Sequence, residues 1–329
     1  MRFFAAAVAV GSLVSGAVAA SPVLYGEAHF SINKFDQLND GELRMDSHHS
    51  AIGIKGSEDL DHGVKLIYKA EFGYDTTEYN GGVDGDSATE ERSSFSDRDQ
   101  WLGLASRDWG VIRFGTISTG YKSSGARLDP LYRTVFEQRG YLGLQSSLHS
   151  GEGPNAGRST NTMRIDSPDW DGVKLVASYA LAELKENTSA VGVHYEKSRL
   201  KASFDYLKSE SKKAAAYKLG VGYALGKQFN LSFQYEAADE VLFDEAVVSA
   251  VDLGVIDSVY KIDMSYVTGN NAWIIAYGAQ SGYSSSYLLA WDYKLSPNTD
   301  IYAGYAYKGF DRAGVESDTV VAFGLKHKF

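Results

Sequence analysis

Short segments in which apolar and polar side chains alternate recur from one end of this sequence to the other. The clearest covers residues 64–72, whose even-numbered positions are all apolar and whose odd-numbered positions include three charges: Lys65, Lys69 and Glu71. A β-strand points successive side chains to opposite sides, so this segment predicts a strand with one apolar face and one charged face. A soluble sandwich has no need of such a strand, whereas the wall of a water-filled barrel in lipid does.

Sixteen segments show this alternation, and their connections alternate between short turns and longer polar stretches. The predicted strands are residues 23–32, 50–56, 64–72, 98–105, 111–118, 160–166, 173–181, 188–195, 200–208, 215–224, 230–236, 255–266, 273–280, 286–295, 300–308 and 319–329. Roughly 19 residues are available for each strand and its connection, enough for the ~10 residues of a tilted strand that spans a bilayer. The sequence therefore predicts one all-β domain, a transmembrane antiparallel β-barrel of about 16 strands.

The last predicted strand ends on an aromatic residue, Phe329. Val321, Phe323 and Leu325 share its parity, and the opposite parity carries two lysines. This arrangement is typical of a strand that closes a barrel in lipid against the first strand.

The first twenty residues have the pattern of an export signal. Arg2 supplies a positive charge, residues 3–14 are apolar, and residues 17–20 offer small side chains for cleavage. We expect residues 1–20 to be a signal peptide and residues 21–329 to be the barrel domain. The chain has no cysteine, which excludes disulfides and thiolate sites, and its formal net charge of −10 argues against a nucleic-acid partner.

One long connection, between residues 118 and 159, is not merely polar. It carries eight large apolar or aromatic side chains: Leu128, Leu131, Tyr132, Val135, Phe136, Tyr141, Leu142 and Leu144. So much apolar surface does not remain unpacked in water. We expect this connection to fold onto the inside of the barrel wall.

Five motifs follow one another along the chain. They are Leu24-Tyr25-Gly26, residues 50–60, Trp101-Leu102-Gly103-Leu104 with Trp109-Gly110, Arg164-Ile165-Asp166-Ser167-Pro168, and Gly324-Leu325-Lys326-His327-Lys328-Phe329. In this order, and over nearly the whole mature chain, they resemble the Gram-negative general porin family. The resemblance implies a homotrimeric, sixteen-stranded channel in outer-membrane lipid, through which small hydrophilic solutes and ions diffuse passively without a cofactor. It also implies that the outer-membrane assembly machinery reads Phe329 as an assembly signal.

The resemblance further implies a pore constriction in which a third extracellular loop, folded into the lumen, opposes a basic wall. The basic wall would comprise Lys69, Arg98, Arg113 and Arg164, with Arg44 and Lys65 as further candidates, and the loop carboxylates would be Asp129, Glu137 and Glu152. Many relatives carry Gly-Arg after the fifth strand, whereas here Gly115 is followed by Thr116. Other roles for these groups stay open: the basic residues as rim ion pairs, Asp129 as a turn former before Pro130, and the loop as an exposed trimer latch.

Opposite charges across a narrow passage create a transverse field that orients polar solutes and disfavours lipophilic ones. The acidic net charge predicts a mild preference for cations. An alternative is a porin selective for sugars or phosphate. A barrel enzyme is a weaker one, because the seven histidines show no catalytic spacing and Gly-x-Ser-x-Gly is absent. The adjacent His48 and His49 would point to opposite faces of a strand, so no metal site is expected.

Overall fold

The computed structural model describes residues 22–36, 41–77, 95–137, 158–181, 187–210, 214–238, 258–311 and 314–329. Within these ranges no helix is long and apolar enough to cross a membrane. Apart from the short helix α1 (Gly120–Ala126) and the 3-10 turn η2 (Asp61–Gly63), the regular elements are strands. They are β1 (Val23–Phe35), β2 (Leu43–Ser47), β3 (Ala51–Asp59), β4 (Lys65–Gly73), β5 (Ser96–Ser106), β6 (Gly110–Ser118), β7 (Arg158–Asp166), β8 (Val173–Ala180), β9 (Thr188–Lys197), β10 (Leu200–Ser209), β11 (Ala214–Leu225), β12 (Phe229–Ala238), β13 (Ser258–Thr268), β14 (Asn271–Gln280), β15 (Ser284–Ser296), β16 (Thr299–Phe310) and β17 (Asp318–Lys328).

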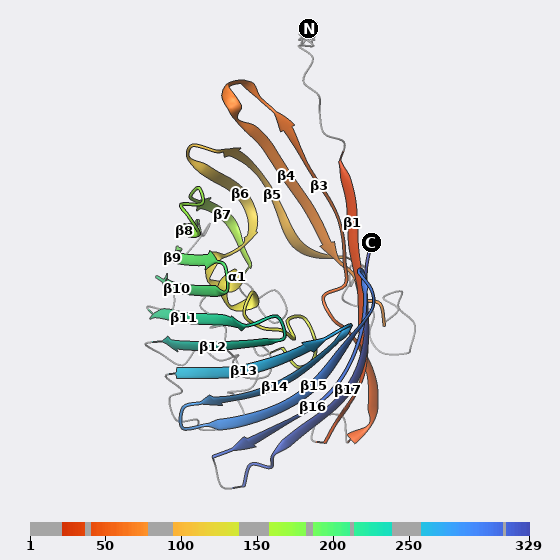
Figure 1. Cartoon of the computed structure of the whole chain (residues 1–329). Coiled ribbons are helices and arrows are strands. Elements are labelled where there is room, and N and C mark those ends of the chain that lie inside the picture. The colour runs from red at the N-terminus through yellow and green to blue at the C-terminus, as the bar shows by residue number, and fades with distance from the viewer. Residues whose placement is uncertain are drawn as a thin grey trace, which may run out of the picture.

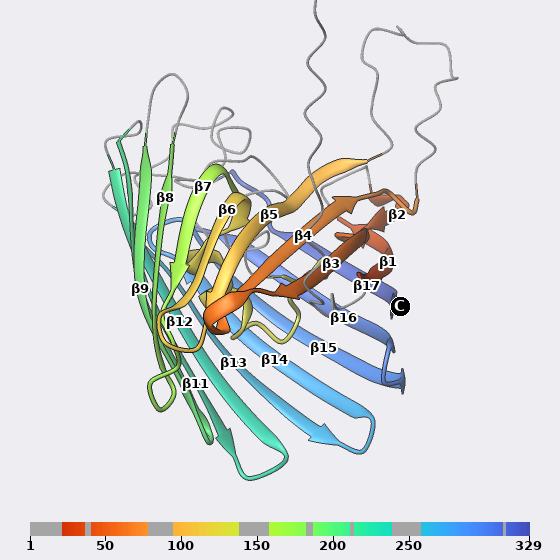
Figure 2. The ribbon, with the colours of Figure 1, turned by 90° about the horizontal axis from the view of Figure 1, so that it is seen from above.

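From β3 onward, each strand pairs antiparallel with the next along the chain, so the strands follow one another around a ring (Figures 1 and 2). The ring closes where β17 pairs with β1. β2 pairs with one end of β1 and β3 with the other, so these two strands together occupy a single position in the wall. The fold is therefore a closed antiparallel barrel with sixteen strand positions, which confirms the predicted fold class.

All sixteen predicted strands are present, with ends that lie within three residues of the predicted ones. The sequence reading missed β2, which is only five residues long. Within the part of the chain that the structure describes, it pairs with one end of β1, and so short a run gives little alternation to detect.

The two faces of the strands differ as the alternation predicts. In β17, Val321 and Phe323 are 53% and 49% exposed, whereas Val320 and Ala322, on the other face, are buried. The exposed face is apolar and points out of the ring. Its exposed aliphatic and aromatic side chains form the belt that a lipid bilayer requires.

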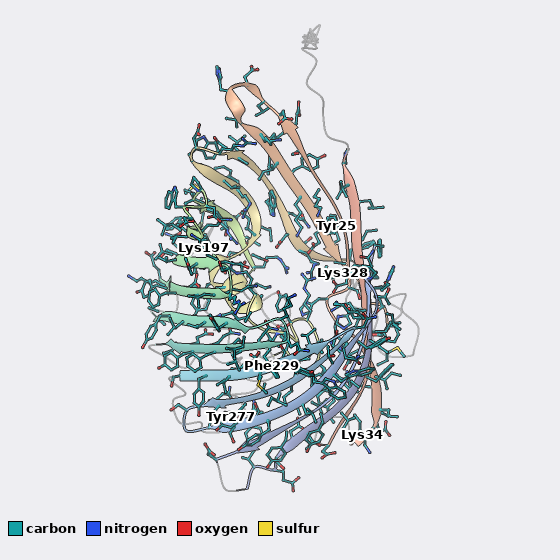
Figure 3. All side chains as sticks on the ribbon, in the orientation of Figure 1. Tyr25, Lys34, Lys197, Phe229, Tyr277 and Lys328 are labelled. Atoms are coloured by element: carbon teal, nitrogen blue, oxygen red, sulfur yellow. The ribbon has the colours of Figure 1, made fainter. Side chains whose placement is uncertain are left out.

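Aromatic side chains gather in two rows across the outer face of β11–β15. The row near the long connections contains Tyr217, Tyr235, Tyr260, Tyr277 and Tyr287, and the row near the short turns contains Phe229, Tyr266, Trp273 and Trp291. Phe229 and Tyr277 stand at opposite ends of their strands in Figure 3. Such rows mark the two interfaces between a bilayer and water, and the apolar residues between them cross the hydrocarbon.

Residues 120–136, which follow β6, pack against the inner face of the wall. Helix α1 contacts β8, β9, β10 and β11 and lies within the ring of strands in Figure 1. Of the eight apolar residues named in the sequence, Leu128, Leu131 and Phe136 are buried, and the last three, Tyr141, Leu142 and Leu144, lie outside the described residues. Leu131 and Phe136 join a cluster with inner side chains of β14–β17.

Small residues on the inner wall make room for this packing. A Cβ atom added to Gly220 would lie 2.5 Å from Leu128 Cδ1, and one added to Gly304 would lie 2.7 Å from Phe136 Cε2. Both glycines are in strands, where they weaken packing unless another group approaches closely. Their role here is to accept the large side chains of residues 128–136.

Candidate functional site

Eight charged side chains from β4, β5, β6 and β7 form one group, called the β4–β7 cluster below. Its members are Lys69, Glu71, Arg98, Asp99, Arg113, Arg158, Arg164 and Asp166. Five are cations and three are carboxylates, so the cluster has a formal balance of +2. Each carboxylate lies between two of the cations.

Glu71 and Asp99 link the cations of β4, β5 and β7. Glu71 Oε1 lies 2.6 Å from Arg98 Nε, and Glu71 Oε2 lies 2.9 Å from Lys69 Nζ. The Tyr25 hydroxyl also donates to Glu71, at 2.8 Å. Asp99 lies 3.2 Å from Lys69 Nζ and accepts from Arg158 Nε at 2.8 Å. Lys69 therefore bridges the two carboxylates.

Asp166 occupies the same kind of position between two arginines. It accepts from Arg113 Nη2 at 2.8 Å and from Arg164 Nε at 2.7 Å. Arg164 Nη1 also donates to the backbone carbonyl of Ser118, at 2.6 Å, which links this pair to the end of β6. Hydrogen bonds between charged groups are the stronger kind and fix the direction of a guanidinium.

Two irregularities in the strand pairing bring these charges together. The register between β4 and β5 shifts between Ala70 and Phe72, so that Arg98 and Asp99 both lie opposite Glu71. A second register shift, between β6 and β7, lies between Gly115, which pairs with Thr162, and Ile117, which pairs with Ser159. A bulge places an extra residue in one strand and re-aims its side chain. Arg98 can thus pair with Glu71 of β4, and Asp99, its neighbour in sequence, can pair with Lys69 of the same strand.

A second set of charges joins residues 133–137 to β1 and to the residues before β3. Arg133 Nη1 lies 3.8 Å from Glu27 Oε1, and the Arg133 guanidinium stands over the Tyr132 ring. The backbone N–H of Arg133 donates to Glu137 Oε2 at 2.6 Å. The same oxygen lies 4.0 Å from His49 Nε2. Arg133 has a positive φ of 68°, so a strained backbone presents it.

The predicted basic residues fall into two groups. Lys69, Arg98, Arg113 and Arg164 lie together in the β4–β7 cluster. Lys65 instead pairs with Asp59 at the short-turn rim, where its side chain is 55% exposed, and Arg44 pairs with Asp46 on β2. Asp99, Arg158 and Arg133 were not among the predicted constriction residues, because alternation alone cannot locate a bulge or an arginine in a loop.

The predicted carboxylates also lie apart from one another. Asp129 is bound to Lys261 of β13 at 3.0 Å, and Glu137 lies beside Arg133 and His49. Glu152 is outside the described residues. Within the described ranges, no group of three or more His, Cys, Asp or Glu side chains is arranged to hold a metal ion.

The last residue lies at the seam between β17 and β1. Backbone hydrogen bonds join Gly26 N to Phe329 O at 2.9 Å and Phe329 N to Gly26 O at 3.1 Å. The Phe329 ring lies over Gly26, where an added Cβ would come within 2.3 Å of Phe329 Cζ. Tyr25 and Lys328 mark this seam in Figure 3.

The chain is similar to a porin family and to several outer-membrane proteins. The sequence model of the family described as Gram-negative porin matches residues 5–313. An outer membrane porin protein of Bordetella pertussis is 20% identical over 348 residues, covering 90% of this chain and 86% of the relative. The major outer membrane protein P.IB of Neisseria gonorrhoeae is 26% identical over 180 residues, covering 55% of this chain and 45% of that protein.

Solved porin structures share the fold. The anion-selective porin from Comamonas acidovorans superposes with a TM-score of 0.73 at 20% identity, covering 94% of this chain and 99% of that one. Salmonella typhi OmpF in complex with daunomycin gives a TM-score of 0.71 at 13% identity, covering 94% of this chain and 97% of that one. Since the family match extends over nearly the whole sequence, and the barrel agrees with it, this chain belongs to the Gram-negative porin family.

Proposed function

We propose that this porin favours small anions among the solutes that cross it, and that the β4–β7 cluster carries the preference. Family membership makes the protein a channel of the Gram-negative outer membrane for the passive diffusion of small hydrophilic solutes and ions. We propose that this is its function and that it is not an enzyme. The selectivity and the position of the constriction are the parts that we infer.

The charge balance of the β4–β7 cluster supports an anion preference. Its three carboxylates are each shared by two cations, which leaves an excess of positive charge on one stretch of the inner wall. The whole chain has a formal net charge of −10, but fixed charges more than about 8 Å from a permeating ion are largely screened at physiological ionic strength. Local charge in a narrow passage therefore outweighs the sum over the molecule.

We place the constriction where residues 120–137 approach the wall. Helix α1 packs on β8–β11, and farther along the same segment Arg133 comes within 3.8 Å of Glu27 on β1. The segment thus makes contacts at widely separated positions of the ring. A solute that passes beside it would meet Arg133 on one side and the β4–β7 cluster on the wall.

The remaining expectations follow from the resemblance to general porins. We propose that three copies of the chain assemble in outer-membrane lipid, that residues 1–20 are removed on export, and that the assembly machinery reads Phe329. Native gels of the detergent-extracted protein and the N-terminal sequence of the mature chain test the first two.

Reversal potentials in planar bilayers test the selectivity. The purified protein should form channels with stable single-channel conductance. In a potassium chloride gradient, the reversal potential should have the sign expected when chloride is more permeant than potassium. Cation preference under the same gradient would contradict the role given to the β4–β7 cluster. Absence of ion conductance from correctly folded protein would contradict the channel function itself.

A further inference from the structure

We propose that two buried lysines of the wall, Lys218 on β11 and Lys261 on β13, hold residues 120–131 in position. In this arrangement Asp129 belongs to the anchor and does not set the electric field of the passage. The proposal rests on the constriction proposed above and adds the residues that fix its position. We call residues 120–131 the anchored segment.

Lys261 ties the end of the anchored segment to β13. Its side chain is only 1% exposed, and its Nζ lies 3.0 Å from Asp129 Oδ1 and 3.1 Å from Asp263 Oδ2. Ser232 of β12 adds to this contact, since its hydroxyl lies 2.9 Å from the Leu128 carbonyl and is also hydrogen-bonded to Asp263. One lysine and one serine therefore connect two strands of the wall to consecutive residues of the segment.

Lys218 makes the second attachment, at the beginning of α1. Its side chain is 2% exposed, and its Nζ lies 3.3 Å from the Tyr121 carbonyl and 4.2 Å from the centre of the Tyr121 ring. Lys218 also lies 3.5 Å from Glu236, which accepts a hydrogen bond from the Tyr121 hydroxyl at 2.7 Å. The buried Tyr121 is thus bound at its backbone and at the tip of its side chain.

Both attachments work only while the segment stays in place. A buried ammonium group is tolerated when it is paired and hydrogen-bonded, and removing one partner leaves a charge that is very unfavourable. If the segment moved away, Lys261 would lose Asp129, and Lys218 would lose the carbonyl and ring of Tyr121. Leu128 would also leave its place over Gly220 and Gly222. The anchored segment should therefore have two states, one in which both attachments to the wall are made and one in which both are broken.

The position of Asp129 separates its anchoring role from a role in the field. Its side chain is 5% exposed and its charge is opposed by a buried lysine at 3.0 Å. Asp129 and Lys261 are both closed off from water, so this pair contributes little potential to a solute in the passage, whereas the β4–β7 cluster includes Lys69, which is 21% exposed. Field-setting carboxylates on a porin loop would instead face the basic wall across open solvent.

The experiment compares Lys261→Met, Lys218→Met and Asp129→Asn with the wild-type channel in planar bilayers. Lys294→Met is the control, because Lys294 pairs with Asp300 between β15 and β16, away from the segment. Folding is checked by heat-modifiable migration in gels. For Lys261→Met we expect the displaced state to become on the order of a hundredfold more populated. It should appear as open-channel current noise and stepwise conductance changes.

Asp129→Asn should also raise the noise, by a smaller factor, while the reversal potential stays at the wild-type value. Lys294→Met should leave the noise unchanged. The anchor is refuted if folded Lys261→Met or Lys218→Met conducts as quietly as the wild type. It is equally refuted if Asp129→Asn shifts the reversal potential without any change in noise. Should Lys261→Met fail to fold, Lys218→Met and Asp129→Asn decide the question. A wild-type channel that prefers cations would overturn the proposed selectivity and leave the anchor standing.

Discussion

Glu71→Gln offers a direct test of the electrostatics proposed for the passage. Glu71 lies between Arg98 and Lys69 and accepts a hydrogen bond from Tyr25. Glutamine has nearly the same shape, and its amide oxygen can still accept one of these bonds. The substitution therefore removes one negative charge while changing the packing little, and the formal balance of the β4–β7 cluster rises by one unit.

The size of the effect follows from Coulomb's law. One charge about 5 Å from a permeating ion is worth about 0.8 kcal/mol in water. Screening in 0.1 M salt, where the Debye length is about 10 Å, lowers this to about 0.5 kcal/mol. The added positive charge attracts an anion and repels a cation by similar amounts, so the difference between them is about 1 kcal/mol. The ratio of anion to cation permeability should rise about fivefold.

The assay is the reversal potential of a potassium chloride gradient across a planar bilayer, measured at low and high salt. Asp59→Asn is a matched control, because it also converts a carboxylate to an amide, but at an exposed pair with Lys65 on the short-turn rim. The control should change the ratio little. A Glu71→Gln ratio that stays constant, or that moves toward cations, would refute the assignment of the β4–β7 cluster to the passage.

Three other substitutions test separate parts of the structure. Asp166→Asn removes the carboxylate between Arg113 and Arg164, and salt-gradient potentials should again shift toward anions. Gly304→Ala places a methyl group against Phe136 and should destabilise the barrel by about 1–3 kcal/mol, seen as a lower urea midpoint of unfolding; an unchanged midpoint would argue against this packing. Gly26→Val and deletion of Phe329 should both reduce the yield of compact barrel on unheated gels, because each removes the Phe329 ring from its place over β1. Wild-type yield from both would show that this contact is dispensable.

Alternation was sufficient to predict the wall, because each membrane-spanning strand has to satisfy the same two environments. Val321 and Phe323 must face lipid, and Ala322 between them must face inward, so the side-chain types alternate along the sequence in the same way as the two faces of the strand. β2 could not be predicted in this way. Its five residues pair with one end of β1, and so short a strand does not span the bilayer by itself.

The contacts between distant side chains were harder to predict than the face of the strand on which each side chain lies. Asp129 and Lys261 lie 132 positions apart in the sequence and meet only because the segment after β6 crosses to β13. Arg98 and Asp99 would point to opposite faces of a regular strand, and only the bulge lets Arg98 pair with Glu71 while Asp99 pairs with Lys69. The period of a strand determines which side a residue faces. It carries no information on which distant residue it meets there.

The seam between β1 and β17 has a consequence for how the chain reaches its folded state. Gly26 and Phe329 are joined by two backbone hydrogen bonds, although almost the entire chain separates them. Every other strand pair in the ring joins strands that are close in the sequence. The pair of β1 and β17 cannot form until the last strand is available. Until then β1 and β17 are open edges that can pair with other chains. The step at greatest risk of aggregation is therefore the final one, and a partner that covers either edge until closure would protect the whole barrel.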